Sequence, residues 1–179
     1  MADKLSARAR EEQFRIEIAS FQRHKQDPDA EWAKRGTSRM ALCCEIAELY
    51  LEEIKEMEIA SQKQRLLYSA VSIFKTNNID PDEGFKRLGK TRKELYFALG
   101  ACFLEESEKI INPTLRKEYF NKALSTWWSG KIDPVEALKV FGLTLEEVAA
   151  RIQNSDPEFG PIVPVREFPQ RSSRKPDTI

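Results

Sequence analysis

Three glutamates in the first third of the chain have a spacing that could bind a metal ion. Glu45, Glu48 and Glu52 follow one another at intervals of three and four residues, so they would share one face of a helix. Carboxylate oxygens are ligands that Mg²⁺ takes in proteins, so this face could hold Mg²⁺. Glu52 recurs 53 residues later as Glu105, however, which favours the solvated face of a repeated helix. We expect that solvated face and no bound cofactor, with the metal site as an alternative.

The motif Glu45-x-x-Glu48 resembles half of the metal motif of the all-α nucleotide pyrophosphohydrolases. The resemblance implies metal-dependent hydrolysis of a nucleotide, but the ExxD partner of that motif does not follow on a later helix. His24, the only histidine, lies in a polar stretch and is expected to be a solvated turn residue rather than a general base. The glycines form no phosphate-binding loop. We therefore expect no enzymatic activity.

Basic residues gather around one turn in the middle of the chain. They are Lys86, Arg87, Lys90, Arg92 and Lys93. A short helix, a glycine turn and a longer helix resemble a helix-turn-helix, in which such cations could meet the phosphates of nucleic acid. The whole chain carries no net charge, with 29 basic and 29 acidic residues, and Glu146 and Glu147 begin the corresponding helix of the next copy. A nucleic-acid-associated regulator that uses this turn together with the basic turn of the first copy is therefore the second interpretation, behind a protein-binding one. The cations of that first turn are Arg23, Lys25, Lys34, Arg35 and Arg39.

Three aromatic residues near this turn are further candidates for binding a partner. They are Tyr96, Phe97 and Trp128. Tyr96 and Phe97 lie off the apolar stripe of their helix, and Trp128 follows Trp127, which occupies the stripe. Such rings either contact a neighbouring unit or form an exposed hot spot for a protein partner. We expect a non-catalytic adaptor or regulator that binds another protein.

The elements that position these residues come in repeated copies. Ten of the 32 residues in 68–99 are identical to the residue 53 positions later, where chance gives roughly two. A fainter copy lies upstream, at Asp27-Pro28 and Gly36. Self-similarity at this period indicates stacked helical units. The sequence predicts an all-α fold of three tandem units, at about 13–60, 61–113 and 114–154, with the last unit truncated.

Each unit is predicted to hold a long helix, a short helix and a second long helix. The first long helix of each unit has apolar residues spaced four and then three apart, which places them on one helical face. These sets are Phe14, Ile18 and Phe21; Leu67, Val71 and Phe74; and Phe120, Leu124 and Trp127. We expect these faces to form the core.

The boundaries of the short helix are marked by residues with defined conformational preferences. Asp80 can cap the helix, Pro81 suits its first position, and Glu83 would complete a capping box. Gly89 would end the helix in the left-handed conformation. The same types return as Asp133, Pro134, Glu136 and Gly142, and two further capping boxes are predicted at Thr91 with Glu94 and Thr144 with Glu147.

The remaining sequence features concern the C-terminal segment, the redox environment and the location of the protein. Residues 155–179 hold five of the nine prolines without a helical period, so a flexible tail is expected there. The three cysteines lack metal-binding spacing and suit a reducing compartment. No apolar run approaches a membrane span and no apolar leader begins the chain, so we expect a cytoplasmic location. The sequence does not determine the oligomeric state, nor whether the units form an open arc or a closed bundle.

Overall fold

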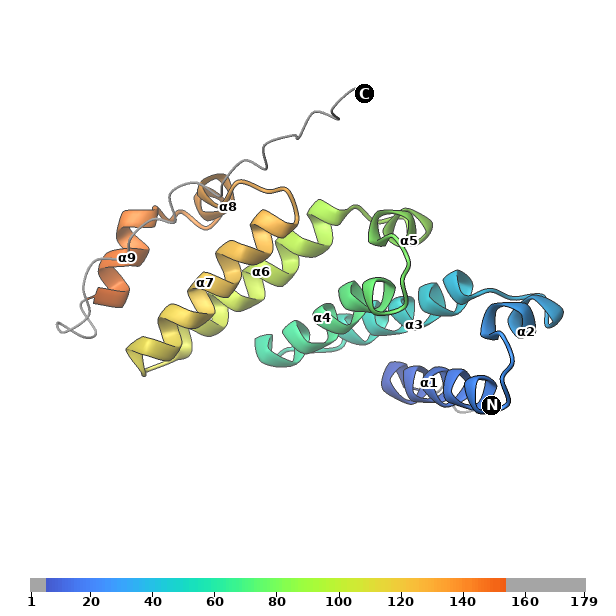
Figure 1. Ribbon diagram of the computed structural model, residues 1–179. Helices are drawn as coiled ribbons and strands as arrows, with labels where there is room; N and C mark the ends of the chain where they lie inside the picture. The colour runs from blue at the N-terminus through green and yellow to red at the C-terminus, as the bar shows by residue number, and fades with distance from the viewer. Residues whose placement is uncertain (1–5, 154–179) are drawn as a thin grey trace, which may run out of the picture.

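The computed structural model describes residues 6–153, where it places nine helices and no strand (Figure 1). The helices are α1 (Ala7–Arg23), α2 (Pro28–Lys34), α3 (Arg39–Lys55), α4 (Ala60–Thr76), α5 (Pro81–Arg87), α6 (Arg92–Lys109), α7 (Pro113–Ser129), α8 (Pro134–Val140) and α9 (Leu145–Gln153). The predicted tail, residues 155–179, lies outside the described residues. None of the described helices is long and apolar enough to cross a lipid bilayer.

The helices repeat with the register that the sequence predicts. The first long helix of each unit begins at Ala7, Ala60 or Pro113, and each start lies 53 residues after the one before. The short helices and the second long helices keep the same offset. α9 spans nine residues, whereas α3 and α6 span 17 and 18. The long–short–long repeat is therefore confirmed, and within residues 6–153 its last helix is the shorter one that the sequence predicts.

The short helices are capped by aspartate, but not through the predicted capping box. Asp80 accepts a hydrogen bond from the Asp82 amide at 3.0 Å, two residues on, and Asp133 accepts one from Val135 at 2.8 Å. Glu83 contacts Arg87 instead, as Glu136 contacts Lys139 (2.7 Å). The prediction for these glutamates was wrong because a basic residue one turn ahead competes for each carboxylate.

The capping boxes predicted for the second long helices are confirmed. The Glu94 carboxylate accepts from the Thr91 amide at 2.7 Å, and the Thr91 hydroxyl accepts from the Glu94 amide at 3.2 Å. The pair Thr144 and Glu147 repeats this arrangement at 2.8 and 3.1 Å. The hydrogen bonds to Thr91 lower the pKa of Glu94, as expected for a carboxylate that receives amide donors.

Each unit turns its chain at two left-handed residues. Gly36, Gly89 and Gly142 follow the short helices with φ of 73°, 64° and 66°, which confirms the predicted glycine turns. A second left-handed position follows the first long helix, and it was not predicted because two of the three residues there are lysines, which do not favour positive φ. The three residues are Lys25, Asn78 and Lys131, with φ of 56°, 57° and 58°. The amide that follows each of them bonds back to the helix at 2.9 Å, which closes the helix end.

Replacing Gly142 with valine should lower the stability by about 1–3 kcal/mol, because a β-branched residue strongly disfavours positive φ. A Cβ built at Gly142 meets nothing within 4 Å, so backbone conformation alone causes the loss. Thermal melting measures it. Gly142→Asn is the matched control and should melt near the wild type, because asparagine tolerates this region, as Asn78 does. Equal melting of the valine variant and the wild type would contradict this account.

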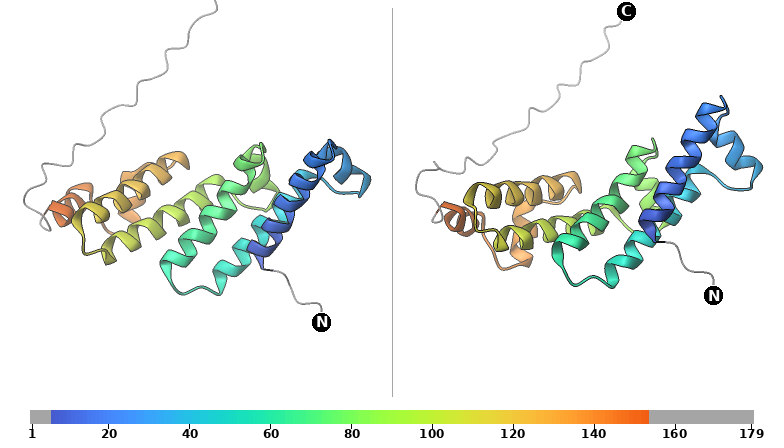
Figure 2. Two further views of the ribbon diagram at one scale, coloured as in Figure 1. Left: turned by 60° about the horizontal axis from the view of Figure 1, so that its bottom comes forward. Right: turned by 90° about the horizontal axis from the view of Figure 1, so that it is seen from below.

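The long helices form an open array. In chain order α1 packs on α3, α3 on α4, α4 on α6, α6 on α7, and α7 on α9. α1 and α9 lie at opposite ends of the molecule in all views (Figures 1 and 2). The short helices α2, α5 and α8 lie along one edge, where the first helix of each unit ends. The described helices are therefore an open arc rather than a closed bundle.

The core is built from equivalent positions of the three units. The predicted stripes are buried or half-buried throughout, with Phe74 and Trp127 fully buried. Each short helix adds one large buried side chain at the same position, and these are Trp32, Phe85 and Leu138. In unit one the Trp32 ring stacks on Phe14 at 5.2 Å. In unit two Phe85 meets Phe74 edge to face at 5.5 Å. In these two units the short helix is thus anchored by aromatic packing.

Candidate interaction surface

The basic turn of unit two divides into exposed lysines and paired arginines. Lys86 lies near the end of α5, Lys90 in the turn, and Lys93 in the first turn of α6, all with exposed side chains. We call these three the unit-two lysines. Arg87 is also exposed, and its guanidinium lies 3.6 Å from the Glu83 carboxylate. Within this cluster, the three lysines therefore present the charge that no ion pair with a described residue neutralises.

Arg92 holds two units together. Its Nε donates to Asp82 Oδ1 at 2.6 Å, and its Nη1 donates to the Ser129 carbonyl of unit three at 3.3 Å. The guanidinium also lies over the Tyr96 ring, 5.7 Å from its centre. The hydrogen bond from Arg92, with a smaller effect of the Lys131 charge, lowers the pKa of Asp82. Arg92 is thus committed to a structural role at this junction.

Tyr96 and Phe97 contact neighbouring elements. The half-buried Tyr96 ring meets Phe85 edge to face at 6.4 Å, and burial raises the pKa of its hydroxyl. Phe97 stacks on Trp127 at 6.3 Å and on Phe141 at 5.8 Å. These rings join α6 to α5, to α7 and to the end of α8. Of the two alternatives left open for them, contact with neighbouring elements is the one observed.

Trp128 is the exposed aromatic of the predicted set. Its side chain is 62% exposed, whereas the adjacent Trp127 is fully buried and donates its indole N–H to the Phe97 carbonyl at 3.2 Å. The equivalent positions of the other units carry Lys75 and Gln22. Trp128 directly precedes Ser129, whose carbonyl accepts a hydrogen bond from the Arg92 guanidinium. The Trp128 ring is therefore a large apolar group that is exposed to solvent next to the junction between units two and three.

The carboxylate candidates lie along α3 and are not gathered into a site. Glu45 accepts two bonds from the Arg10 guanidinium, at 2.7 and 3.1 Å, so its carboxylate joins α3 to α1. Glu48 and Glu52 are exposed on the same helix. Among residues 6–153 no three His, Cys, Asp or Glu side chains are placed to hold a metal ion. His24 caps α1, with Nδ1 2.8 Å from the Ser20 carbonyl.

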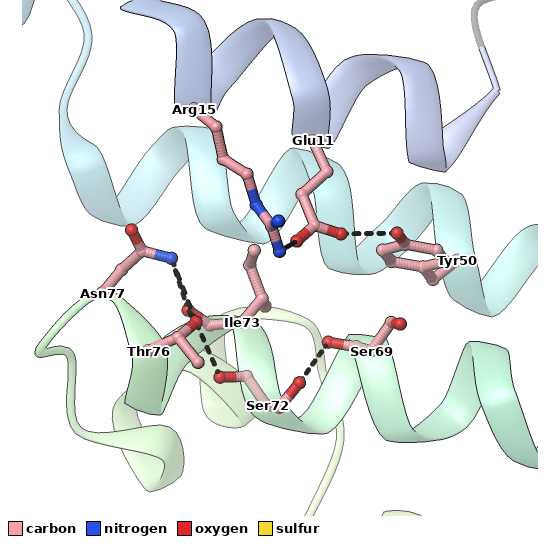
Figure 3. A network of polar contacts seen from close by, with 8 residues as sticks. All are labelled: Glu11, Arg15, Tyr50, Ser69, Ser72, Ile73, Thr76 and Asn77. Atoms are coloured by element: carbon pink, nitrogen blue, oxygen red, sulfur yellow. Dashed lines mark hydrogen bonds and ion pairs between the residues drawn. The ribbon is translucent and has the colours of Figure 1, made fainter. Parts of the chain in front are cut away.

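A polar junction between α1 and α3 was missed by the sequence analysis (Figure 3). The Tyr50 hydroxyl donates to Glu11 at 2.5 Å, and Arg15 contacts the same carboxylate. Burial and then the Glu11 bond raise the pKa of Tyr50 to about 12, so the hydroxyl keeps its proton and remains a donor. The available signal was that Tyr50 stands where the repeat has Phe103. A hydroxyl added to a core position requires a polar partner.

Comparison with known proteins gives no relative from which a function could be transferred. No protein-family model matches the chain, and no curated protein or solved structure matches it significantly. A function for this chain therefore has to be inferred from its own geometry.

Proposed function

We propose that this protein is a non-catalytic helical-repeat adaptor or regulator that binds another protein through a surface centred on Trp128. The observation that carries the proposal is the 62% exposure of this ring. Trp is among the residues that contribute most to binding energy at protein interfaces, because it buries a large area at low cost in side-chain entropy. Its equivalents Lys75 and Gln22 are polar, so the repeat itself does not require an aromatic residue there.

The arrangement of charge also supports a protein partner. Arg39 pairs with Asp29 through two bonds of 3.0 Å, Arg92 pairs with Asp82, and Arg87 lies near Glu83. Cations that are neutralised within the fold contribute little to the long-range field that attracts nucleic acid. An open array of helices leaves extended surfaces, which repeat proteins use for binding partners.

Trp128→Ala should remove the protein partner captured by the purified chain from its source cell. Because the ring is exposed, the variant should keep the wild-type melting temperature within a few degrees. Two matched controls should retain the partner: Lys75→Ala, at the equivalent position of unit two, and Tyr68→Ala, which removes another ring that is 59% exposed. The experiment is run with and without nuclease, and mass spectrometry quantifies the partner. Capture that is unaffected by Trp128→Ala would contradict the proposed surface.

The unit-two lysines carry the alternative, a nucleic-acid-associated regulator. If they bind duplex DNA, affinity should fall with salt at a log–log slope of about −0.9 for each phosphate neutralised. Lys86→Glu, Lys90→Glu and Lys93→Glu together should abolish that binding without unfolding the chain. Arg92 is left intact because its loss would break the junction to Asp82 and Ser129. We expect no binding near physiological salt; tight, salt-steep binding that the triple variant loses would favour the alternative.

A further inference from the structure

Trp128 shares one face of α7 with two exposed, uncharged residues. Asn121, Ser125 and Trp128 follow one another at intervals of four and three residues, so they lie along the same side of this helix. All three side chains are exposed to solvent. We call these three residues the α7 face. The corresponding positions of the other units include a cation in each case, Arg15 in unit one and Lys75 in unit two, so the neutral face is specific to unit three.

The charged side chains that border the α7 face are largely balanced by other groups. Glu118, about one turn before the face, forms an ion pair with Lys122 at 2.6 Å. At the other end of the face, Asp82 binds Arg92 and also lies within the field of Lys131. Charges that are balanced within the fold contribute little to the field that a partner experiences. The α7 face therefore offers a partner little net charge to recognise.

The indole N–H of Trp128 is a hydrogen-bond donor that no described residue accepts. The other two indoles of the chain both have acceptors. Trp32 donates to Glu17 at 3.0 Å, and Trp127 donates to the Phe97 carbonyl at 3.2 Å. An indole N–H usually finds an acceptor when its ring becomes buried. A pocket that covers the Trp128 ring therefore needs an acceptor as well as apolar atoms.

We propose, on the basis of the function inferred above, that the protein bound through Trp128 presents an uncharged, apolar surface to the α7 face, with a neutral acceptor for the indole N–H. Charge complementarity is the reason. A charged group of the partner would be buried against Asn121 and Ser125 without a counter-ion, which costs free energy. Neutral groups can instead exchange hydrogen bonds with these two side chains while an apolar pocket takes the ring.

Selection from a phage-displayed library of random peptides on the purified full-length protein tests this chemistry. Peptides that bind the wild type but not Trp128→Ala should be rich in apolar and uncharged residues. A synthetic copy of one such peptide, titrated by fluorescence anisotropy, should bind Trp128→Ala about thirtyfold more weakly, the factor that the 2 kcal/mol of an interface hot spot gives. Trp128→Phe keeps a ring but removes the N–H, and should bind about fivefold more weakly.

Two substitutions of opposite charge at Ser125 separate a neutral partner from a charged one. Ser125→Glu and Ser125→Lys should both weaken peptide binding by about tenfold or more, because either charge would be buried without a counter-ion. If one charge weakened binding and the other strengthened it, the partner would be charged and the proposal overturned. The matched controls are Ala19→Glu and Ala19→Lys, at the exposed equivalent position of unit one, which should leave the affinity unchanged.

Salt dependence is an independent measurement of the same property. The affinity for the peptide should change by less than about twofold between low and physiological salt, because no ion pair is screened. A steep fall with salt would indicate a charged partner and overturn the proposal. Loss of binding in Trp128→Ala combined with opposite effects at Ser125 would overturn the neutral partner and leave the proposed function intact. Peptides that bind Trp128→Ala as well as the wild type, or no enriched peptide, would overturn both.

Discussion

Replacing Gly100 with alanine is expected to destabilise the protein by roughly 1–3 kcal/mol, although alanine is the better helix former by about 1 kcal/mol. Gly100 lies inside α6, and a Cβ built on it would come within 2.2 Å of Trp127 Nε1. The Trp127 ring is fully buried and bonded to the Phe97 carbonyl, so it cannot move aside without losing that bond. Chemical denaturation with a tryptophan fluorescence readout measures the loss.

A second substitution should restore much of this stability. The positions 53 residues earlier than Gly100 and Trp127 are Ala47 and Phe74, both fully buried in one core cluster. One junction thus pairs the smaller residue, Gly100, with the larger ring of Trp127. The other pairs the larger residue, Ala47, with the smaller ring of Phe74. Gly100→Ala with Trp127→Phe should be more stable than the sum of the single variants predicts, by about 1–3 kcal/mol in a double-mutant cycle. Additive losses would mean that the two residues do not share one space.

Replacing Trp32 with alanine is expected to cost about 3–5 kcal/mol, the largest effect that we predict for a single residue. Trp32 is 1% exposed, stacks on Phe14 and meets Phe21 edge to face at 6.0 Å. Its indole N–H also donates to Glu17 at 3.0 Å, so the substitution leaves a cavity and removes this hydrogen bond, although Arg35 stays 3.5 Å from the other Glu17 oxygen. Such a loss is a large fraction of the 5–15 kcal/mol typical of a domain.

The effect of Trp32→Ala should be confined to the first unit. Units of a repeat array contact only their neighbours, so α1 and α2 should open before α6 and α7 do. Amide hydrogen exchange should therefore accelerate most in α1–α3. Trp128→Ala is the matched control: the same substitution at a ring that is 62% exposed should change the stability by no more than about 0.5 kcal/mol. Uniform acceleration from α1 to α9 would show that the array unfolds as one body.

The fold was largely predictable because its signals are local and repeated. Asp-Pro, glycine and threonine–glutamate pairs each fix a helix boundary by backbone chemistry, and the 53-residue offset showed them twice. The left-handed Lys25 and Lys131 were missed because lysine does not favour this conformation, which the closing hydrogen bond sets; only Asn78, at the same position of unit two, is a residue type that tolerates it. The preference of Glu83 for Arg87 was missed because two local rules compete for one carboxylate.

The candidate surface was only partly predictable, because exposure depends on which helices become neighbours. Phe97 and Trp128 both lie off the stripes of their own helices, and nothing in their sequence positions separates them. Phe97 is covered because the end of α8 brings Phe141 onto it, whereas no described element covers Trp128 to the same extent. The sequence does not distinguish Arg92 from the neighbouring basic residues, because only the fold brings Asp82 and the Ser129 carbonyl within hydrogen-bond distance of its guanidinium.

The bond from Arg92 to Ser129 ends on a backbone carbonyl, and every amino acid supplies one. A unit that docks on Arg92 therefore needs the right helix end but no particular side chain at that point. The middle unit could be duplicated in the gene, and its Arg92 would then face Thr76 of the copy in place of Ser129. Gly100 would meet Phe74, a smaller ring than the tryptophan it now accommodates. A junction that depends on the main chain in this way lets the number of units change while the sequences of the units diverge.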